Sequence, residues 1–276
     1  MGKVGACGAG GARNRGWATA FGASLVAAVG SQPIVPQSIE WAPGNSARVA
    51  EWVRAWRGCR PWLAEFMERG ERDRSVPVVN RLLARPRPWR CCISDGANRA
   101  ALDTIAFAAA KAADLIQVRA KEMDAGRLLE FCFAARAACQ GTGALLLVND
   151  RLDVALAAGF DGVQLPAAGM PVGRVREQAG AEFLVGQSCH SAAEVAQSQA
   201  DFALLGPIFP TPSKLAFGPA LGLAALRQAA ECAVPVLAVG GVTDGNAAAC
   251  IGAGAAGVAA IRAWQTGNFF SRQPVE

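Results

Sequence analysis

From residue 89 onward the chain repeats one pattern, a short continuous apolar run followed by a stretch rich in Ala, Leu and Arg. The apolar runs predict strands at Trp89–Ser94, Leu115–Arg119, Ala144–Val148, Gly162–Leu165, Phe183–Gly186, Phe202–Leu205, Val236–Val239 and Gly257–Ala260. Strands that are apolar throughout and alternate with helices indicate a parallel sheet covered on both faces. Eight such units in roughly 190 residues are typical of a compact (β/α)8 TIM barrel, and an open doubly wound sheet rarely needs eight parallel strands. The predicted fold class is therefore α/β, as a TIM barrel.

The stretches between the predicted strands have the composition of helices. They predict helices at Ala100–Ala113, Ala125–Gln140, Val172–Ala179, Ala192–Gln199, Gly222–Cys232 and Asp244–Ala253. The last stretch, Gln265–Glu276, is short and polar, so the eighth helix is expected to be poorly formed.

The first 86 residues lack this alternation and are rich in Gly, Arg and Pro. One helix is predicted there, at Ala47–Arg69, and the Pro-rich run Arg85-Pro86-Arg87-Pro88 marks a boundary. We therefore divide the chain into an N-terminal extension, residues 1–86, that is disordered or partly helical, and a barrel domain, residues 87–276. Because the composition changes before the first strand, we expect the barrel to fold without the extension.

Composition excludes several classes of partner. The net charge of +5 is modest and no basic face is interleaved with aromatic residues, so nucleic-acid binding is not expected. No run is long and apolar enough to span a membrane. The nine cysteines contain no C-x-x-C pair and fit buried thiols in a reducing compartment better than a disulfide framework. We expect a cytoplasmic protein whose partners are small molecules; whether it forms a homo-oligomer is left open.

Polar residues gather just after the predicted strands, and in a TIM barrel that end of the strands forms the active face. They are Gln117, Arg119 and Lys121 after the second strand, Asn149 and Asp150 after the third, Ser188 and His190 after the fifth, Thr211, Ser213 and Lys214 after the sixth, Gly240 and Gly241 after the seventh, and Ile261 and Arg262 after the eighth. The chain has only four lysines against 23 arginines, and Lys121 and Lys214 are two of the four. A compact, flexible charge at both positions suits a phosphate.

The spacing of these groups favours a polyanion as ligand. Strand alternation places Gln117, Arg119 and Lys121 on one side, and Lys214 lies across the barrel from them. Phosphate or diphosphate is the natural ligand for such a set of cations. Gly240 and Gly241 would let backbone N–H groups approach a second phosphate, at the usual barrel site after the seventh and eighth strands.

Each of these signals also has a plainer interpretation. Arg119 and Lys121 could form structural ion pairs with Asp150 and Glu122, and Asn149-Asp150 could cap the following helix. Lys214 could be a solvated loop lysine. His190, the only histidine of the chain, could be structural. The joint occurrence of these residues at one end of the barrel favours the functional interpretation.

In these motifs, residues 89–264 resemble the superfamily of thiamine phosphate synthases and TenI-type thiazole tautomerases, whose members are (β/α)8 barrels. The motifs are Gln117-x-Arg119-x-Lys121, Asn149-Asp150-Arg151-x-Asp153-x-Ala155, Gly186-x-Ser188-x-His190, Gly206-Pro207-Ile208-Phe209-x-Thr211-x-Ser213-Lys214, Gly240-Gly241 and Gly252-Ala253-x-x-x-Gly257-Val258-Ala259. Their order and spacing match over nearly the whole barrel domain.

The resemblance implies a transferase of thiamine biosynthesis that binds hydroxymethylpyrimidine diphosphate with Mg²⁺, releases diphosphate and joins the pyrimidine to the nitrogen of thiazole phosphate. Arg119, Lys121, Asn149 and Lys214 would hold the diphosphate, Ser188 would neutralise or orient it, and Asp150 would bind Mg²⁺. The thiazole phosphate would be held by Thr211, Ser213, Gly241 and the Ile261-Arg262 backbone, with Gln117 and Gly240 as further substrate-binding residues.

The chain departs from the synthase pattern after the fourth strand. Synthases usually show His-Leu/Ile-Gly-Gln-x-Asp there, and this Asp is a second Mg²⁺ ligand; here the run is Gln164-Leu165-Pro166-Ala167-Ala168-Gly169, with Gly169 at the acidic position. The Gln-Leu-Pro run is closer to the tautomerase branch, in which His190 would be an acid/base, since a histidine titrates near neutrality. The cations and the Asn149-Asp150 pair favour the synthase, because a tautomerase has no diphosphate to bind. A barrel that binds a phosphate or thiamine precursor without catalysis is the third interpretation.

Overall fold

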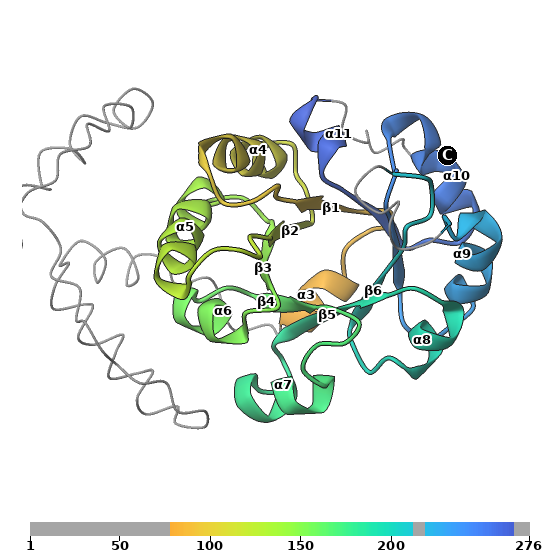
Figure 1. Ribbon diagram of the computed structural model, residues 1–276, viewed down its shortest axis with the longest axis horizontal. Coiled ribbons are helices and arrows are strands. Elements are labelled where there is room, and N and C mark those ends of the chain that lie inside the picture. Colours follow the sequence, from red (N-terminus) through yellow and green to blue (C-terminus); the bar gives the residue numbers. More distant parts are fainter. Residues whose placement is uncertain (1–77, 212–218, 268–276) are drawn as a thin grey trace, which may run out of the picture. The chain divides into compact units, whose positions relative to one another are not determined.

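The computed structural model describes residues 78–211 and 219–267, in which eight parallel strands close into a barrel in chain order, with β8 paired to β1 (Figure 1). The strands are β1 (Trp89–Ile93), β2 (Leu115–Val118), β3 (Leu145–Asn149), β4 (Gly162–Leu165), β5 (Leu184–Cys189), β6 (Phe202–Leu205), β7 (Val236–Val239) and β8 (Gly257–Ala260). The predicted TIM barrel is confirmed. The predicted helix Ala47–Arg69 lies outside the described residues.

Helices follow the strands around the outside of the barrel (Figure 1). They are α4 (Arg99–Ala110), α5 (Ala125–Ala138), α6 (Leu152–Ala158), α7 (Val172–Ala179), α8 (Ala192–Gln197), α9 (Gly222–Ala230), α10 (Asp244–Gly252) and the short α11 (Arg262–Gln265). Several begin at a side-chain cap that satisfies a backbone N–H of the first turn: Asn98 for α4, Asp124 for α5 and Ser191 for α8. The predicted helices therefore form, with ends that differ from the predicted ones by at most three residues.

β5 continues beyond the apolar run that predicted it. The prediction ended at Gly186, whereas the strand runs to Cys189, because Ser188 and Cys189 pair in register with Leu204 and Leu205 of β6. Backbone pairing, and not side-chain hydrophobicity, extends this strand. The extension brings Ser188 into the barrel wall.

The inside of the barrel is filled by large apolar side chains from the starts and middles of the strands. Trp89, Leu115, Leu145, Leu184, Phe202 and Leu237 all belong to one buried cluster. This filled interior is a packed core rather than a pore. It leaves the other end of the strands for polar side chains.

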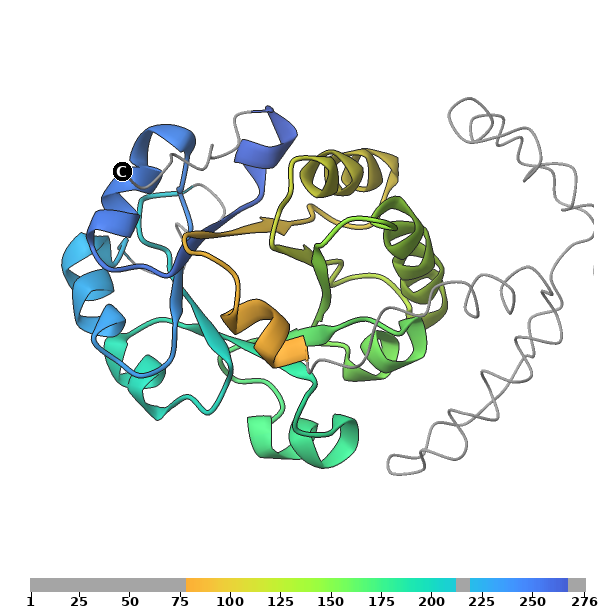
Figure 2. The same cartoon turned by 180° about the vertical axis from the view of Figure 1, so that it is seen from behind.

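A helix that precedes the first strand, α3 (Val78–Leu83), lies within the ring of strands when the barrel is viewed along its axis from either side (Figure 1 and Figure 2). Its Leu82 is 0 % exposed and belongs to the same cluster as Trp89, Leu115 and Leu145. The unit of the chain that holds the barrel spans Glu65–Glu276 and so includes α3. We assigned residues 78–83 to the extension, but Leu82 is part of the barrel core.

An aspartate precedes each of β2, β4 and β6, and its carboxylate binds the backbone of the strand before it in the chain. The backbone N–H of Arg90 donates to Asp114, that of Leu146 to Asp161 and that of Val185 to Asp201, over 2.7–2.9 Å. Each aspartate also has an arginine partner. These ion pairs are Arg85–Asp114, Arg81–Asp161 and Arg176–Asp201.

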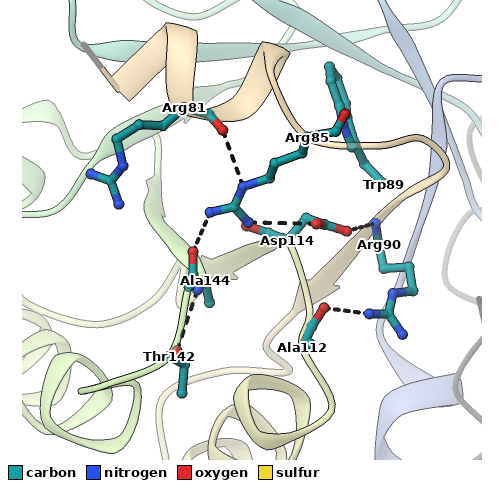
Figure 3. A network of polar contacts seen from close by, with 9 residues as sticks. Arg81, Arg85, Trp89, Arg90, Ala112, Asp114, Thr142 and Ala144 are labelled. Carbon is teal, nitrogen blue, oxygen red and sulfur yellow. Dashed lines mark hydrogen bonds and ion pairs between the residues drawn. The ribbon is translucent and has the colours of Figure 1, made fainter. Parts of the chain in front are cut away.

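Two of these three arginines connect α3 to the barrel. Arg81 is in α3, and Arg85 follows it and donates to the backbone carbonyls of Asp114 and Gly143 (Figure 3). The indole N–H of Trp89 donates to the Arg85 carbonyl over 3.3 Å. Because Asp114 and Asp161 precede their strands, α3 closes the N-terminal end of the barrel, opposite the end where the predicted site residues lie.

The seven cysteines within the described ranges are thiols, and all of them except Cys232 are buried. Burial raises the pKa of the Cys91 thiol to about 12 and that of Cys189 to about 11. Cys91 and Cys189 therefore stay protonated near neutrality, and the buried cysteines act as small apolar side chains, as the sequence predicts. Within the same ranges, no helix is both long and apolar enough to cross a membrane.

Candidate active site

Four polar side chains from adjacent strands line the C-terminal mouth of the barrel: Gln117 of β2, Asn149 of β3, Gln164 of β4 and Ser188 of β5. We refer to these four as the polar arc. The Gln117 amide N–H donates to Asn149 Oδ1 over 3.0 Å, and the Gln164 amide N–H donates to Ser188 Oγ over 3.2 Å. Asn149 and Gln164 are register partners, so the two pairs are neighbours. The structure thus brings together three predicted site residues and one, Gln164, that was not predicted.

These hydrogen bonds leave specific groups of the polar arc for a ligand. Gln117 is 3 % exposed, and its Oε1 has no hydrogen-bond partner. A buried acceptor without a partner is costly, and a bound N–H donor would remove that cost. Asn149 accepts through its oxygen, which leaves its amide N–H groups as donors. The arc therefore combines one acceptor with donors suited to an anion.

Arg119 and Lys121 follow β2 beside this arc, where the chain is held by the end of β1. Ser94 accepts from the Arg119 backbone N–H over 2.9 Å, and the Gly96 N–H donates to the Arg119 carbonyl over 3.1 Å. In the part of the chain that the structure describes, neither Arg119 nor Lys121 forms an ion pair. The proposed structural ion pairs with Asp150 and Glu122 are absent there, and both cations remain available to a ligand.

Asn149 and Asp150 do not cap the helix that follows them. The N-cap of α6 is Arg151, which makes no side-chain capping hydrogen bond, whereas Asn149 bonds with Gln117. Asp150 has φ of +63°, a left-handed conformation that is uncommon for a residue other than glycine. Such a conformation at the mouth of a barrel is typical of a functional position.

The donor set at the mouth fits a hard cation that takes most of its ligands from a substrate. Asp150 is exposed, and its carboxylate forms no ion pair with any residue in the described ranges. Those ranges contain no group of three or more His, Cys, Asp or Glu residues that could hold a metal. Mg²⁺ usually keeps several waters and is held by one or two carboxylates with substrate phosphates. Asp150 therefore fits Mg²⁺ as a single protein ligand.

The position of the second carboxylate is built differently in this chain. The Gly169 N–H donates to the Pro166 carbonyl over 3.0 Å and closes a tight turn. A Cβ at residue 169 would lie 2.7 Å from Pro166 Cδ, closer than real Cβ atoms come to other atoms. An aspartate at this position would not fit the turn, and the backbone of the turn therefore explains why glycine stands there.

His190 follows β5 and joins it to the end of β6. Its Nδ1 lies 2.6 Å from the Gly206 carbonyl oxygen, and its backbone N–H donates to Glu194 over 2.8 Å. A carbonyl can only accept, so Nδ1 carries the hydrogen and Nε2 is the acceptor of the neutral ring. His190 is thus held in one tautomer, with an exposed ring.

The ends of β6, β7 and β8 form the other half of the mouth. Arg262 Nη2 donates to Thr211 Oγ1 over 2.8 Å, which connects the segment after β6 with α11. Ile261 packs against the core cluster just before Arg262. The predicted residues Ser213 and Lys214 lie outside the described residues.

The two glycines after β7 allow a close approach of backbone segments. Gly240 has φ of +88° and Gly241 of +66°. A Cβ at Gly241 would lie 2.8 Å from the carbonyl oxygens of Phe209 and Pro210. Only glycine fits this crossing of the segments after β6 and β7.

Two site residues were missed by sequence reasoning, Gln164 and Ser94. Gln164 is a polar residue inside a run of apolar ones, two positions after Gly162, and period-2 alternation would have placed it on the inner face. Ser94 ends the first predicted strand, and nothing in the sequence distinguishes it from an ordinary strand end. The hydrogen bond of Ser94 to the next strand appears only in the folded barrel.

Comparison with known proteins agrees with this geometry. The model of the thiamine monophosphate synthase family matches residues 91–264. The chain belongs to this family. A thiamine-phosphate synthase of Methanoculleus marisnigri is 45 % identical over 172 residues, which cover 61 % of this chain and 82 % of the relative.

Two further relatives are consistent with this family. A putative thiamine-phosphate synthase of Geobacter sulfurreducens is 47 % identical over 153 residues, or 54 % of this chain and 71 % of the relative. The solved structure of a thiamine phosphate pyrophosphorylase from Pyrococcus furiosus is 30 % identical, with a TM-score of 0.58 over 67 % of this chain and 87 % of that structure. The resemblance to the thiamine monophosphate synthase family that the motifs indicate is thereby confirmed.

Proposed function

We propose that this barrel is a thiamine phosphate synthase, a transferase that joins hydroxymethylpyrimidine diphosphate to thiazole phosphate and releases diphosphate. The observation that carries the proposal is the pair of cations after β2. Arg119 and Lys121 have no carboxylate partner in the described residues and follow the strand whose Gln117 begins the polar arc. Cations left without a partner beside amide and hydroxyl donors suit a polyanion.

In the proposed reaction, the bond between the pyrimidine methylene carbon and the diphosphate oxygen breaks, and a bond from that carbon to the thiazole nitrogen forms. Negative charge grows on the leaving diphosphate as the first bond breaks. Arg119, Lys121, the Asn149 amide and the Ser188 hydroxyl would stabilise that charge, because groups fixed in advance stabilise developing charge most effectively. Gln117 Oε1 would accept a hydrogen bond from an N–H of the pyrimidine. Lys214 would add a further cation from the segment after β6.

Asp150 is the residue proposed to hold Mg²⁺, which when bound would neutralise part of the diphosphate charge. The exposed carboxylate at the end of β3 supports this assignment.

Thiazole phosphate is proposed to bind at the ends of β6, β7 and β8. Thr211 and Arg262 are already hydrogen-bonded to each other there, and Gly240-Gly241 let the backbone come close to a phosphate. Ser213 and the Ile261 backbone would complete this half of the site. The two substrates then face each other across the mouth of the barrel.

Replacing Gly241 by Ala is expected to raise KM for thiazole phosphate by about 10-fold or more with a smaller change in KM for the pyrimidine substrate. The new Cβ would clash with the Phe209 and Pro210 carbonyls and shift the segment that carries Thr211. Gly173→Ala is the matched control, because a Cβ at that helical position meets nothing within 4 Å. Equal changes in both KM values would argue against a thiazole phosphate site next to Gly241.

The experiment that tests the proposed function is a metal-controlled assay on the purified full chain. Hydroxymethylpyrimidine diphosphate and the tautomers of thiazole phosphate carboxylate are supplied with and without Mg²⁺, and both thiamine phosphate and isomerisation of the thiazole are followed. Thiamine phosphate formed only with Mg²⁺ would support the synthase, and its loss in Asp150→Asn would support the metal assignment. Isomerisation alone, unaffected by Mg²⁺ and lost in His190→Gln, would instead support the tautomerase, for which the single tautomer of His190 leaves Nε2 as the proton acceptor. Tight phosphate binding without turnover would support a binding protein.

We also propose a cytoplasmic location, supported by the buried thiols of the barrel, which suit a reducing compartment. Its ligands would be phosphorylated small molecules. We further propose that the barrel domain includes α3 and therefore begins before residue 87, since Leu82 belongs to the core cluster of the barrel.

A further inference from the structure

Gln164 is a buried amide in the wall of the barrel. It is 1 % exposed and lies on β4 between its register partners Asn149 and Gly186. Gly186 makes room for it, because a Cβ at residue 186 would lie 2.2 Å from Gln164 Oε1. The amide is therefore fixed on the side of β5, where Ser188 lies two residues beyond Gly186.

The contact between Gln164 and Ser188 fixes which atom of the hydroxyl faces a ligand. Gln164 Nε2 donates to Ser188 Oγ over 3.2 Å, so the serine oxygen accepts and its hydrogen must point elsewhere. No residue in the described ranges accepts a hydrogen bond from that hydroxyl. Ser188 is half-buried on the inner face of β5, so its free hydrogen is available toward the mouth of the barrel.

We propose that Gln164 is a positioning residue that holds the Ser188 hydroxyl as a hydrogen-bond donor toward the leaving diphosphate. The proposal rests on the proposed synthase function. Gln117 and Asn149 form a similar pair on β2 and β3. The Gln117 amide N–H donates to Asn149 Oδ1, which leaves the Asn149 N–H groups as donors. In the polar arc, the buried amides of Gln117 and Gln164 thus leave Asn149 and Ser188 as the donors to the anion.

A purely structural role for Gln164 makes a different prediction. Its Nε2 also lies 3.4 Å from the Leu165 carbonyl, a long contact that could anchor the amide without any part in catalysis. If that were its whole role, replacing Gln164 would lower kcat by the same factor whether or not residue 188 carries a hydroxyl. If Gln164 acts through Ser188, the effect disappears once the hydroxyl is removed.

The test is a double-mutant cycle of Gln164→Met and Ser188→Ala in the full chain. Methionine has a similar shape but no N–H donor, so kcat is expected to fall about 10-fold with little change in KM, as for the loss of one hydrogen bond in the transition state. In the Ser188→Ala background, the same substitution is expected to change kcat by less than about 2-fold. Equal losses in both backgrounds would overturn the proposal.

Controls separate this effect from misfolding and from failure of the proposed function. Gln187→Met is the control, because it also removes an amide beside Ser188, on β5. The Gln187 side chain faces away from the mouth and accepts a hydrogen bond from Ser198, so its loss should leave kcat unchanged. If Gln164→Met unfolds, Gln164→Glu takes its place in the cycle, because a carboxylate accepts from Ser188 and reverses the hydroxyl. If the wild-type chain makes no thiamine phosphate, the proposed function fails. The double-mutant cycle is then measured on the dissociation constant for inorganic diphosphate. Absent or uncoupled binding there overturns the inference as well.

Discussion

Replacing Arg119 by Ala is expected to lower kcat/KM for thiamine phosphate formation by about 10²- to 10³-fold. The guanidinium is proposed to neutralise charge that grows on the leaving diphosphate, so most of its contribution belongs to the transition state. The backbone of Arg119 is held by Ser94 and Gly96 independently of its side chain, and the side chain forms no ion pair in the described residues. The thermal unfolding midpoint is therefore expected to stay unchanged.

Steady-state kinetics and a thermal melt on the same preparation check this expectation. Arg127→Ala is the control, because Arg127 is an exposed arginine of α5 whose ion pair in the described residues is with Asp124, the N-cap of that helix, and its loss should change neither quantity appreciably. Arg119→Lys is expected to recover only part of the loss, since an ammonium cannot bind a phosphate with the two parallel hydrogen bonds of a guanidinium. Near wild-type kinetics in Arg119→Ala would overturn the assignment of Arg119 to the diphosphate.

The barrel itself could be predicted because its strands are short, apolar and separated by helical stretches. β4, β6, β7 and β8 begin and end at the predicted residues, and in the first three Asp, Pro or Gly stands on each side of the apolar run. β5 was predicted too short because the polar residues Gln187 and Ser188 interrupt the apolar run, while backbone pairing with β6 continues the strand. Hydrophobicity cannot reveal the end of a strand whose last side chains are polar.

The candidate site could be predicted as a set of residues but not as a network. Strand ends placed Gln117, Asn149 and Ser188 at one end of the barrel, and the structure agrees. Their partners depend on the register between neighbouring strands, which sets Asn149 beside Gln164 and Gln164 beside Gly186. The sequence therefore could not assign Gln164 to the site, although it shows a polar residue within an apolar strand there.

Residues 78–83 were assigned to the extension, and the contacts of α3 lead to a second large expected effect. Composition places residues 78–83 in the extension, since they are followed by the Pro-rich run before β1. In the structure, Leu82 contributes to the barrel core and Arg81 and Arg85 pair with Asp161 and Asp114. A helix that closes one end of a barrel need not share the barrel's alternating pattern.

Leu82→Ala is expected to lower the free energy of unfolding by about 2–5 kcal/mol, as for other buried leucines replaced by alanine. Its neighbour Leu83→Ala provides the matched control, because Leu83 is 49 % exposed while Leu82 is 0 % exposed. The exposed substitution should change stability by no more than about 0.5 kcal/mol. Chemical denaturation of both variants measures the difference, and equal effects would show that α3 does not contribute to the core.

Two truncations extend the same argument to the whole segment. Removing residues 1–77 leaves α3 and its ion pairs in place, so this shortened chain is expected to fold and retain activity. Removing residues 1–86 also deletes Leu82, Arg81 and Arg85, which uncovers the apolar side chains around Leu115 and Leu145 and leaves the buried carboxylates of Asp114 and Asp161 without these arginines. A buried carboxylate that loses its ion-pair partner destabilises a protein strongly, and the cavity left by Leu82 adds to that effect. The longer truncation is therefore expected to be insoluble or to melt at a much lower temperature, and equal stability of the two chains would show that the barrel needs no closure at its N-terminal end.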